Sequence, residues 1–199
     1  MIKVRLLAVV IFAAGVLVTR THAQELPKKG PGPKPAPSAS EAVLQQWNDI
    51  GRKLIAMAED FPEDKYDFKP TPAVRSFAER LIHAAAANYF FTNPALGQKP
   101  PGEEDPKRSD FKNKADVVMF VKKSFTDGAG AIKTKGDKGM SDVVVDPFAE
   151  DVPEQAGRAQ IHLTDLAYGL IEHSGEIYGQ LSVYYRSAGL VPPESRPKK

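Results

Sequence analysis

A helical stripe in the last part of the chain limits the fold more strongly than any other pattern. Between residues 163 and 184, mostly apolar side chains recur at spacings of three and four. At about 100° per residue, these positions share an arc of about 80° on one helix face. The stripe comprises Leu163, Leu166, Leu170, His173, Ile177, Leu181 and Tyr184. Such a face must be buried against other elements, and we predict a helix over residues 154–187.

Three further segments carry the same kind of pattern. We predict helices over residues 40–60, 76–92 and 110–133, with Ser40 as the N-cap of the first. The segment 81–91 is apolar on most sides, which is typical of a central helix. Four amphipathic helices without a repeated strand pattern predict an all-α protein, a four-helix bundle.

Glycines and valines add detail to this prediction. Gly189, followed closely by two prolines, is expected to end the last helix in the left-handed conformation. Glycines within residues 127–131 weaken the third helical pattern, since each costs about 1 kcal/mol relative to alanine. The segment 143–145, three valines, could form a short strand or cover the bundle. We expect the glycines of the last helix to permit close helix approach; they are Gly169, Gly175 and Gly179.

The first 40 residues differ in composition from this helical domain, which we assign to residues 41–199. A basic start, an apolar run from Leu6 to Val18 and small residues before Ala23 are typical of a secretory signal. The run is shorter than the roughly 20 residues of a membrane span. We therefore expect cleavage after Ala23, an exported protein (periplasmic or secreted) and no stable membrane span. Residues 24–40 are rich in proline, glycine and lysine, which predicts a disordered linker.

Charge and cysteine content exclude several classes of function. The chain has 27 basic and 25 acidic residues, a formal net charge of +2. Loss of Lys3, Arg5 and Arg20 with the signal leaves 24 basic and 25 acidic residues, a net charge of −1. A nearly neutral protein has no general attraction for nucleic acid. The absence of cysteine excludes disulfides and a thiol nucleophile.

Two histidines, His83 and His173, lie inside apolar helical segments. Residues four apart share a helix face, so a second histidine at position 177 would complete an H-x-x-x-H pair with His173. Such a pair, together with His83 from a neighbouring helix, would give a three-ligand metal site with open positions. Position 177 is Ile177, however. The alternative is a metal-free cluster in which the two histidines contact each other.

Two segments resemble the signature regions of the DinB-like superfamily. They read DFPEDKYDFKPTPAVRSFAERLIHAAAANYFF and HSGEIYGQLSVYYRSAGLVPPESR, and the resemblance covers residues 41–197. It implies a four-helix bundle, kinship with the YfiT-like thiol transferases, and a divalent ion, often zinc or nickel. In that family, one histidine on the second helix and an H-x-x-x-H pair on the last hold the ion. His83 and His173 match two of these positions, whereas Ile177, at the third, has no lone pair to donate.

Four nearby side chains could in principle replace the missing ligand. His162 shares the helical angle of His173 but lies about 16 Å away along the axis. Glu176 points about 100° away from position 177. Glu172 and Glu79 are no better placed to replace the missing ligand. The sequence therefore predicts an incomplete, two-histidine site.

Two functions stay open at this point. One is a small-ligand-binding or structural module, because a bundle can hold a small molecule between its helices or form a homodimer through a helix face. The other, implied by the resemblance, is a divalent-metal-dependent transferase or hydrolase in which the ion activates a thiol or water. Two points weigh against the enzyme. One metal ligand is missing, and the small thiols that such transferases use are cytoplasmic, whereas we expect this protein to be exported.

Overall fold

A computed structural model of the chain describes residues 34–102, 105–149 and 160–197. The signal expected at residues 1–23 and the greater part of the expected linker lie outside these ranges. In the described ranges, no helix combines the length and the apolar character that crossing a membrane would need.

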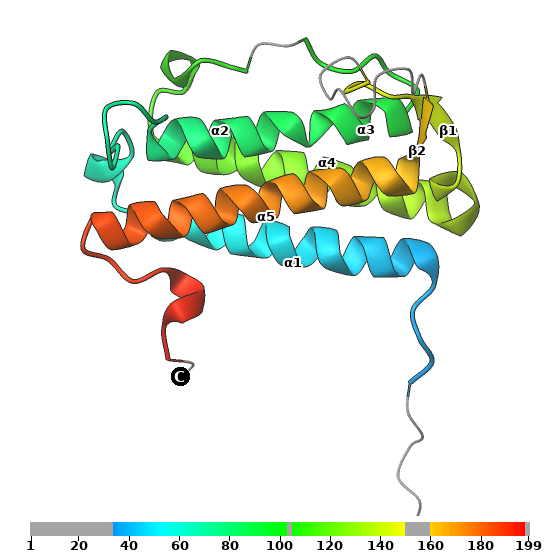
Figure 1. Cartoon of the computed structure of the whole chain (residues 1–199), viewed down its shortest axis with the longest axis horizontal. Coiled ribbons are helices and arrows are strands. Elements are labelled where there is room, and N and C mark those ends of the chain that lie inside the picture. Colours follow the sequence, from blue (N-terminus) through cyan, green and yellow to red (C-terminus); the bar gives the residue numbers. More distant parts are fainter. Residues whose placement is uncertain (1–33, 103–104, 150–159, 198–199) are drawn as a thin grey trace, which may run out of the picture. The chain divides into compact units, whose positions relative to one another are not determined.

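Four long helices form the body of the protein (Figure 1), as the sequence predicts for an all-α four-helix bundle. They are α1 (Ala39–Asp60), α2 (Phe77–Ala87), α4 (Lys114–Met140) and α5 (Leu163–Ser187). α3 (Tyr89–Ala95) follows α2 almost directly, and β1 (Val143–Val145) and β2 (Gln160–His162) form a small antiparallel ribbon. The described residues also contain three short 3-10 turns: η1 (Glu63–Lys65), η2 (Arg108–Asp110) and η4 (Pro193–Ser195).

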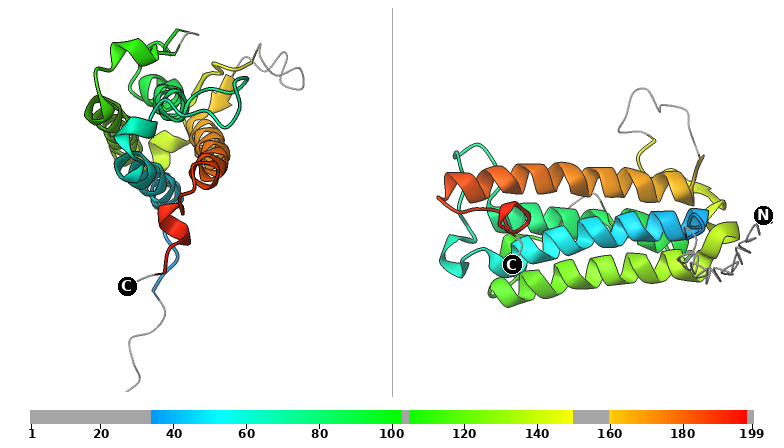
Figure 2. Two further views of the ribbon diagram at one scale, coloured as in Figure 1. Left: turned by 90° about the vertical axis from the view of Figure 1, so that its left-hand side faces the viewer. Right: turned by 90° about the horizontal axis from the view of Figure 1, so that it is seen from below.

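The four helices form a square in cross-section, in which each has two neighbours (Figure 2). α1 packs against α4 and α5, and α2 packs against the same two helices from the other side. α2 and α4 run in the same direction along the bundle (Figure 1). The chain between them must therefore come back along the bundle; residues 96–102 and 105–113 do this, and we call them the return segment.

The N-cap of the first helix lies two residues before the expected position, and the helix begins at Ala39. The N-cap is Ser38 rather than Ser40, because Ser38 and Glu41 form a capping box in which each side chain accepts a hydrogen bond from the other's backbone N–H. Ser40 has a different role: its N–H and hydroxyl both donate to Asp137 Oδ1, at 2.8 and 2.6 Å. The Ser38 hydroxyl donates to the same oxygen at 2.8 Å. One carboxylate thus holds the start of α1.

The predicted helix over residues 76–92 is divided in two. Ser76 caps α2, and Glu79 completes a capping box there. α2 ends at Ala87, and Asn88 separates it from α3. The fully buried Asn88 side chain donates to the Ser124 hydroxyl on α4 at 3.1 Å. A buried polar side chain with a partner on another helix therefore stands at the point where the predicted helix is divided.

Both ends of α4 differ from the prediction of 110–133. Asn113 caps the helix by accepting from Asp116 N–H at 3.0 Å, which delays its start to Lys114. The helix continues through residues 127–131 despite their glycines, because its apolar face is buried against α1. Beyond a kink at Gly136 (φ +57°), a final turn ends at Met140.

The last helix begins later than predicted. Residues 160–162 form β2, which pairs with β1 in a register that sets Val143 opposite His162, so the helix starts only at Leu163. Residues 154–159 of the predicted helix lie outside the described ranges. Gly189 has φ +75° just beyond the helix, which confirms the predicted left-handed cap.

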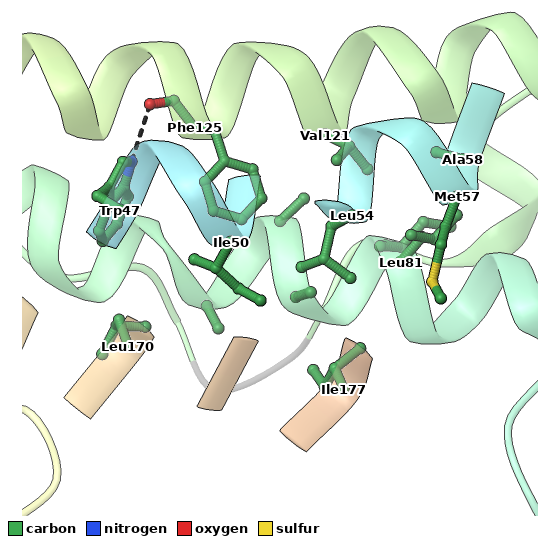
Figure 3. Packing of buried hydrophobic residues seen from close by; sticks show 14 of the residues in the cluster. Trp47, Ile50, Leu54, Met57, Ala58, Leu81, Val121, Phe125, Leu170 and Ile177 are labelled. Carbon is green, nitrogen blue, oxygen red and sulfur yellow. Dashed lines mark hydrogen bonds between the residues drawn. The ribbon is translucent and has the colours of Figure 1, made fainter. Parts of the chain in front are cut away.

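The contact between α1 and α4 centres on Trp47 (Figure 3). Its indole is fully buried and donates to the Phe125 carbonyl at 2.9 Å. A Cβ atom on Gly128 would lie only 2.1 Å from the indole, and one on Gly51 only 2.7 Å from the Phe125 ring. These two glycines therefore permit the close approach. The role predicted for the glycines of α5 is wrong, because a Cβ atom on Gly169, Gly175 or Gly179 would have nothing within 4 Å.

This geometry predicts that Gly128→Ala destabilises the fold. An added methyl group would overlap the indole of Trp47, and overpacking of this kind costs about 1–3 kcal/mol. Gly130→Ala is the matched control on the same helix, because its Cβ atom would meet nothing within 4 Å. The control should be neutral or stabilising by up to about 1 kcal/mol, since alanine favours the helix. Urea unfolding of both variants measures the difference; equal stabilisation by both would contradict the packing described here.

Candidate functional site

His83 and His173 meet where α2 and α5 pack side by side. Their ring centroids are 5.0 Å apart and the ring planes are nearly perpendicular, at 82°. Their side chains are 26% and 33% exposed, so both rings are accessible from one side. The structure thus brings together the two residues that the sequence places on apolar helical segments. We call these two side chains the histidine pair.

The return segment supplies a third member of the site. Asp105 Oδ2 lies 2.8 Å from Nδ1 of His83 and 3.1 Å from the Arg75 guanidinium. Arg75 immediately precedes the N-cap of α2, and His83 lies within this helix. The carboxylate therefore links the return segment both to the start of α2 and to its middle. The sequence gives no local signal for Asp105, because its irregular segment has no periodicity that would fix where a side chain points. Only the return path over α2 brings it here.

The side chains considered as substitute ligands lie elsewhere or make weak contacts. Glu176 is 65% exposed, and its Oε2 is 3.8 Å from Nδ1 of His173, beyond hydrogen-bonding distance. Glu79 is engaged in the cap of α2. His162, at the end of β2, has Nδ1 2.9 Å from the Ser141 carbonyl oxygen. Glu172 is exposed on α5.

Comparison with known families places this arrangement in context. The family model of the DinB superfamily matches residues 46–181, well over half of the chain and a range that includes both histidines and Asp105. The chain belongs to the DinB superfamily. A search of curated proteins gives no match.

Position 177, the third ligand position that the resemblance implies, contributes only hydrocarbon. Ile177 is 1% exposed and belongs to the core cluster, where it packs among apolar side chains that include Leu54 and Leu81 (Figure 3). Among the residues that the structure describes, no three His, Cys, Asp or Glu side chains are grouped so that they could hold a metal ion. Catalytic zinc sites use three protein ligands. The residues present therefore do not fit the three-ligand centre of the family.

The surroundings of His173 favour its neutral form. Burial of the ring lowers the pKa of His173 below the usual value of 6.5, and His83 and Arg80 lower it further. Glu176 and Asp105 act in the opposite direction but do not cancel the effect. Near neutral pH, His173 therefore offers a nitrogen lone pair that can accept a hydrogen bond or bind a metal ion.

We predict that His173 titrates below pH 6.5 and that His83→Ala raises its pKa. The substitution removes a neighbouring ring that disfavours positive charge on His173, and it also admits water. Because the folded-state pKa is lowered, protonation of His173 as the pH falls opposes folding, and the variant should show less of this effect. NMR titration of His173 in both proteins measures the change. A wild-type pKa for His173 at or above 6.5 would refute this description.

Proposed function

We propose that this DinB-superfamily protein is a small-ligand-binding module whose site is the histidine pair. The observation that supports this is the meeting of two partly exposed imidazoles where α2 and α5 pack together, with Asp105 and Arg75 beside His83. Small-molecule sites typically combine an apolar setting with a few convergent polar groups. Here the helix faces provide the apolar setting, and the ring nitrogens provide acceptors or donors for a small polar ligand.

Two observations favour a second candidate, a divalent-metal-dependent transferase or hydrolase. The ring centroids are 5.0 Å apart. Two imidazoles bound to one tetrahedral zinc ion at about 2.0–2.1 Å would have centroids roughly 5 Å apart. In addition, ligating histidines usually donate their other ring N–H to a carboxylate, as His83 can do to Asp105. The hydrocarbon at Ile177 opposes this candidate. If an ion were bound, it would act as a Lewis acid on the ligand.

Metal analysis together with a fragment screen separates the two candidates. If the binding module is correct, purified protein should hold less than about 0.1 zinc or nickel ion per chain, because two imidazoles make a weak site. Fragments that bind should shift the NMR signals of both His83 and His173, and these shifts should disappear in His173→Ala. About one ion per chain, lost on His83→Ala, would instead support the metal-dependent enzyme.

Ile177→His should restore much of the zinc affinity of the family pattern. The new imidazole would lie one turn from His173 on the same face and complete a three-histidine set with His83. We expect zinc to bind at least about tenfold more tightly than it binds to wild type. The substitution also places a polar ring in the core, so the free energy of unfolding without metal should fall by about 2–4 kcal/mol.

Zinc-dependent thermal unfolding isolates the metal effect from this loss of stability. Ile171→His is the matched control, because it adds an imidazole to α5 at the groove toward α1 rather than beside His83. It should show no gain in stability with zinc. If Ile177→His gains no more than the control, the nitrogens of the histidine pair do not converge on a common point.

A further inference from the structure

Asp105 contacts two partners through a single carboxylate oxygen. Oδ2 lies 2.8 Å from Nδ1 of His83 and 3.1 Å from the Arg75 guanidinium. The Asp105 side chain is 30% exposed, so water shields it only in part. A carboxylate that is held from two sides keeps a fixed position, and Arg75 thereby helps to hold Asp105 against the ring of His83.

This contact determines which nitrogen of His83 carries the proton. An ionised carboxylate can only accept hydrogen bonds, so Nδ1 of His83 must be the donor. In a neutral imidazole with a proton on Nδ1, Nε2 has a free lone pair and can accept a proton or a hydrogen bond. The contact with Asp105 therefore commits the two nitrogens of His83 to different roles.

We propose that Asp105 is a positioning residue that holds His83 in its Nδ1–H form, so that Nε2 receives the hydroxyl group of a bound ligand without a metal ion. This inference rests on the proposed function, since it assumes that the histidine pair is the ligand site. A lone pair on Nε2 calls for a ligand that donates a hydrogen bond, and the inference commits to a hydroxyl group as that donor. The ring of His173 lies beside that of His83, with the centroids 5.0 Å apart and the planes nearly perpendicular, and forms the neighbouring part of the site.

The charges around the pair are consistent with a neutral hydroxyl compound. Arg75 is paired with Asp105, so neither presents an unbalanced charge to a ligand. Around His173, Arg80 and Glu176 carry opposite charges. Neither an anion nor a cation is therefore favoured over a neutral ligand.

The first test is the tautomer of His83 in ligand-free, ¹⁵N-labelled protein. NMR shifts of the ring nitrogens should identify Nδ1 as protonated and Nε2 as unprotonated in wild type. Asp105→Ala and Asp105→Asn should convert His83 to a mixture or to the other tautomer, because the acceptor at Nδ1 is lost or can become a donor. Glu176→Gln is the matched control: it changes a carboxylate beside His173 that makes no hydrogen bond to either ring, and it should leave the tautomer of His83 unchanged.

The second test uses phenol and its methyl ether, anisole, as probes of hydroxyl recognition. Both should bind at the histidine pair, phenol at least about fivefold more tightly, because a site that pairs with a hydroxyl discriminates against the analogue that lacks one. The preference should disappear in Asp105→Ala and persist in Glu176→Gln. Circular dichroism of each variant checks that it is folded.

Three outcomes would overturn the inference. A wild-type His83 protonated on Nε2, or a mixture of tautomers, would show that Asp105 does not set the form of the ring. A phenol preference that survives in Asp105→Ala would leave the proposed function standing but remove Asp105 from it. If neither probe shifts the signals of the histidine pair in wild type, the proposed function and the inference fail together, whatever the tautomer.

Discussion

The rest of the bundle depends on the close packing of Trp47 against Gly128. It sets how near α1 and α4 approach each other, and the buried indole N–H is satisfied by the Phe125 carbonyl. The same ring also packs against Phe91 of α3. α2 packs against α4, and α5 packs against α1. The position of the histidine pair, which lies between α2 and α5, therefore follows from the contact between α1 and α4. A loss of fit at the α1–α4 contact would therefore alter the seam where His83 faces His173.

The site also depends on the path of the chain. Since α2 and α4 run in the same direction, the chain has to return along the bundle, and this brings Asp105 to the edge of the histidine pair (Figure 1). The helices provide two rings on rigid supports, whereas the irregular return segment provides the carboxylate that orients one of them. Rigid and irregular parts thus contribute different properties to one site. Ile177, at the third ligand position that the family resemblance implies, contributes only hydrocarbon, whereas Asp105 contacts Nδ1 of His83 directly.

The sequence predicts the helices and the meeting of the two histidines, because both follow from periodic burial. His83 and His173 stand on apolar faces, and such faces must be buried together in a bundle. The sequence does not predict the details that depend on contacts between distant residues. Asn88, where the predicted helix is divided, has its hydrogen-bond partner on α4. The need for glycine at Gly128 arises from the indole of Trp47, which packs against it. The contact of Asp105 with His83 is not predictable for the same reason. The N-cap at Ser38, by contrast, is a local sequence pattern, and the prediction of Ser40 in its place is an error of choice between two nearby serines.

The kink at Gly136 has a mechanical consequence. By turning the end of α4, it brings Asp137 to the first turn of α1, where one carboxylate oxygen accepts three hydrogen bonds from Ser38 and Ser40. These bonds hold the pKa of Asp137 below its usual range, so the anchor stays charged in mildly acidic surroundings. The first turn of α1 is thereby tied to the end of α4, about a hundred residues further along the chain, so that fraying of α1 at its start requires these three hydrogen bonds to break.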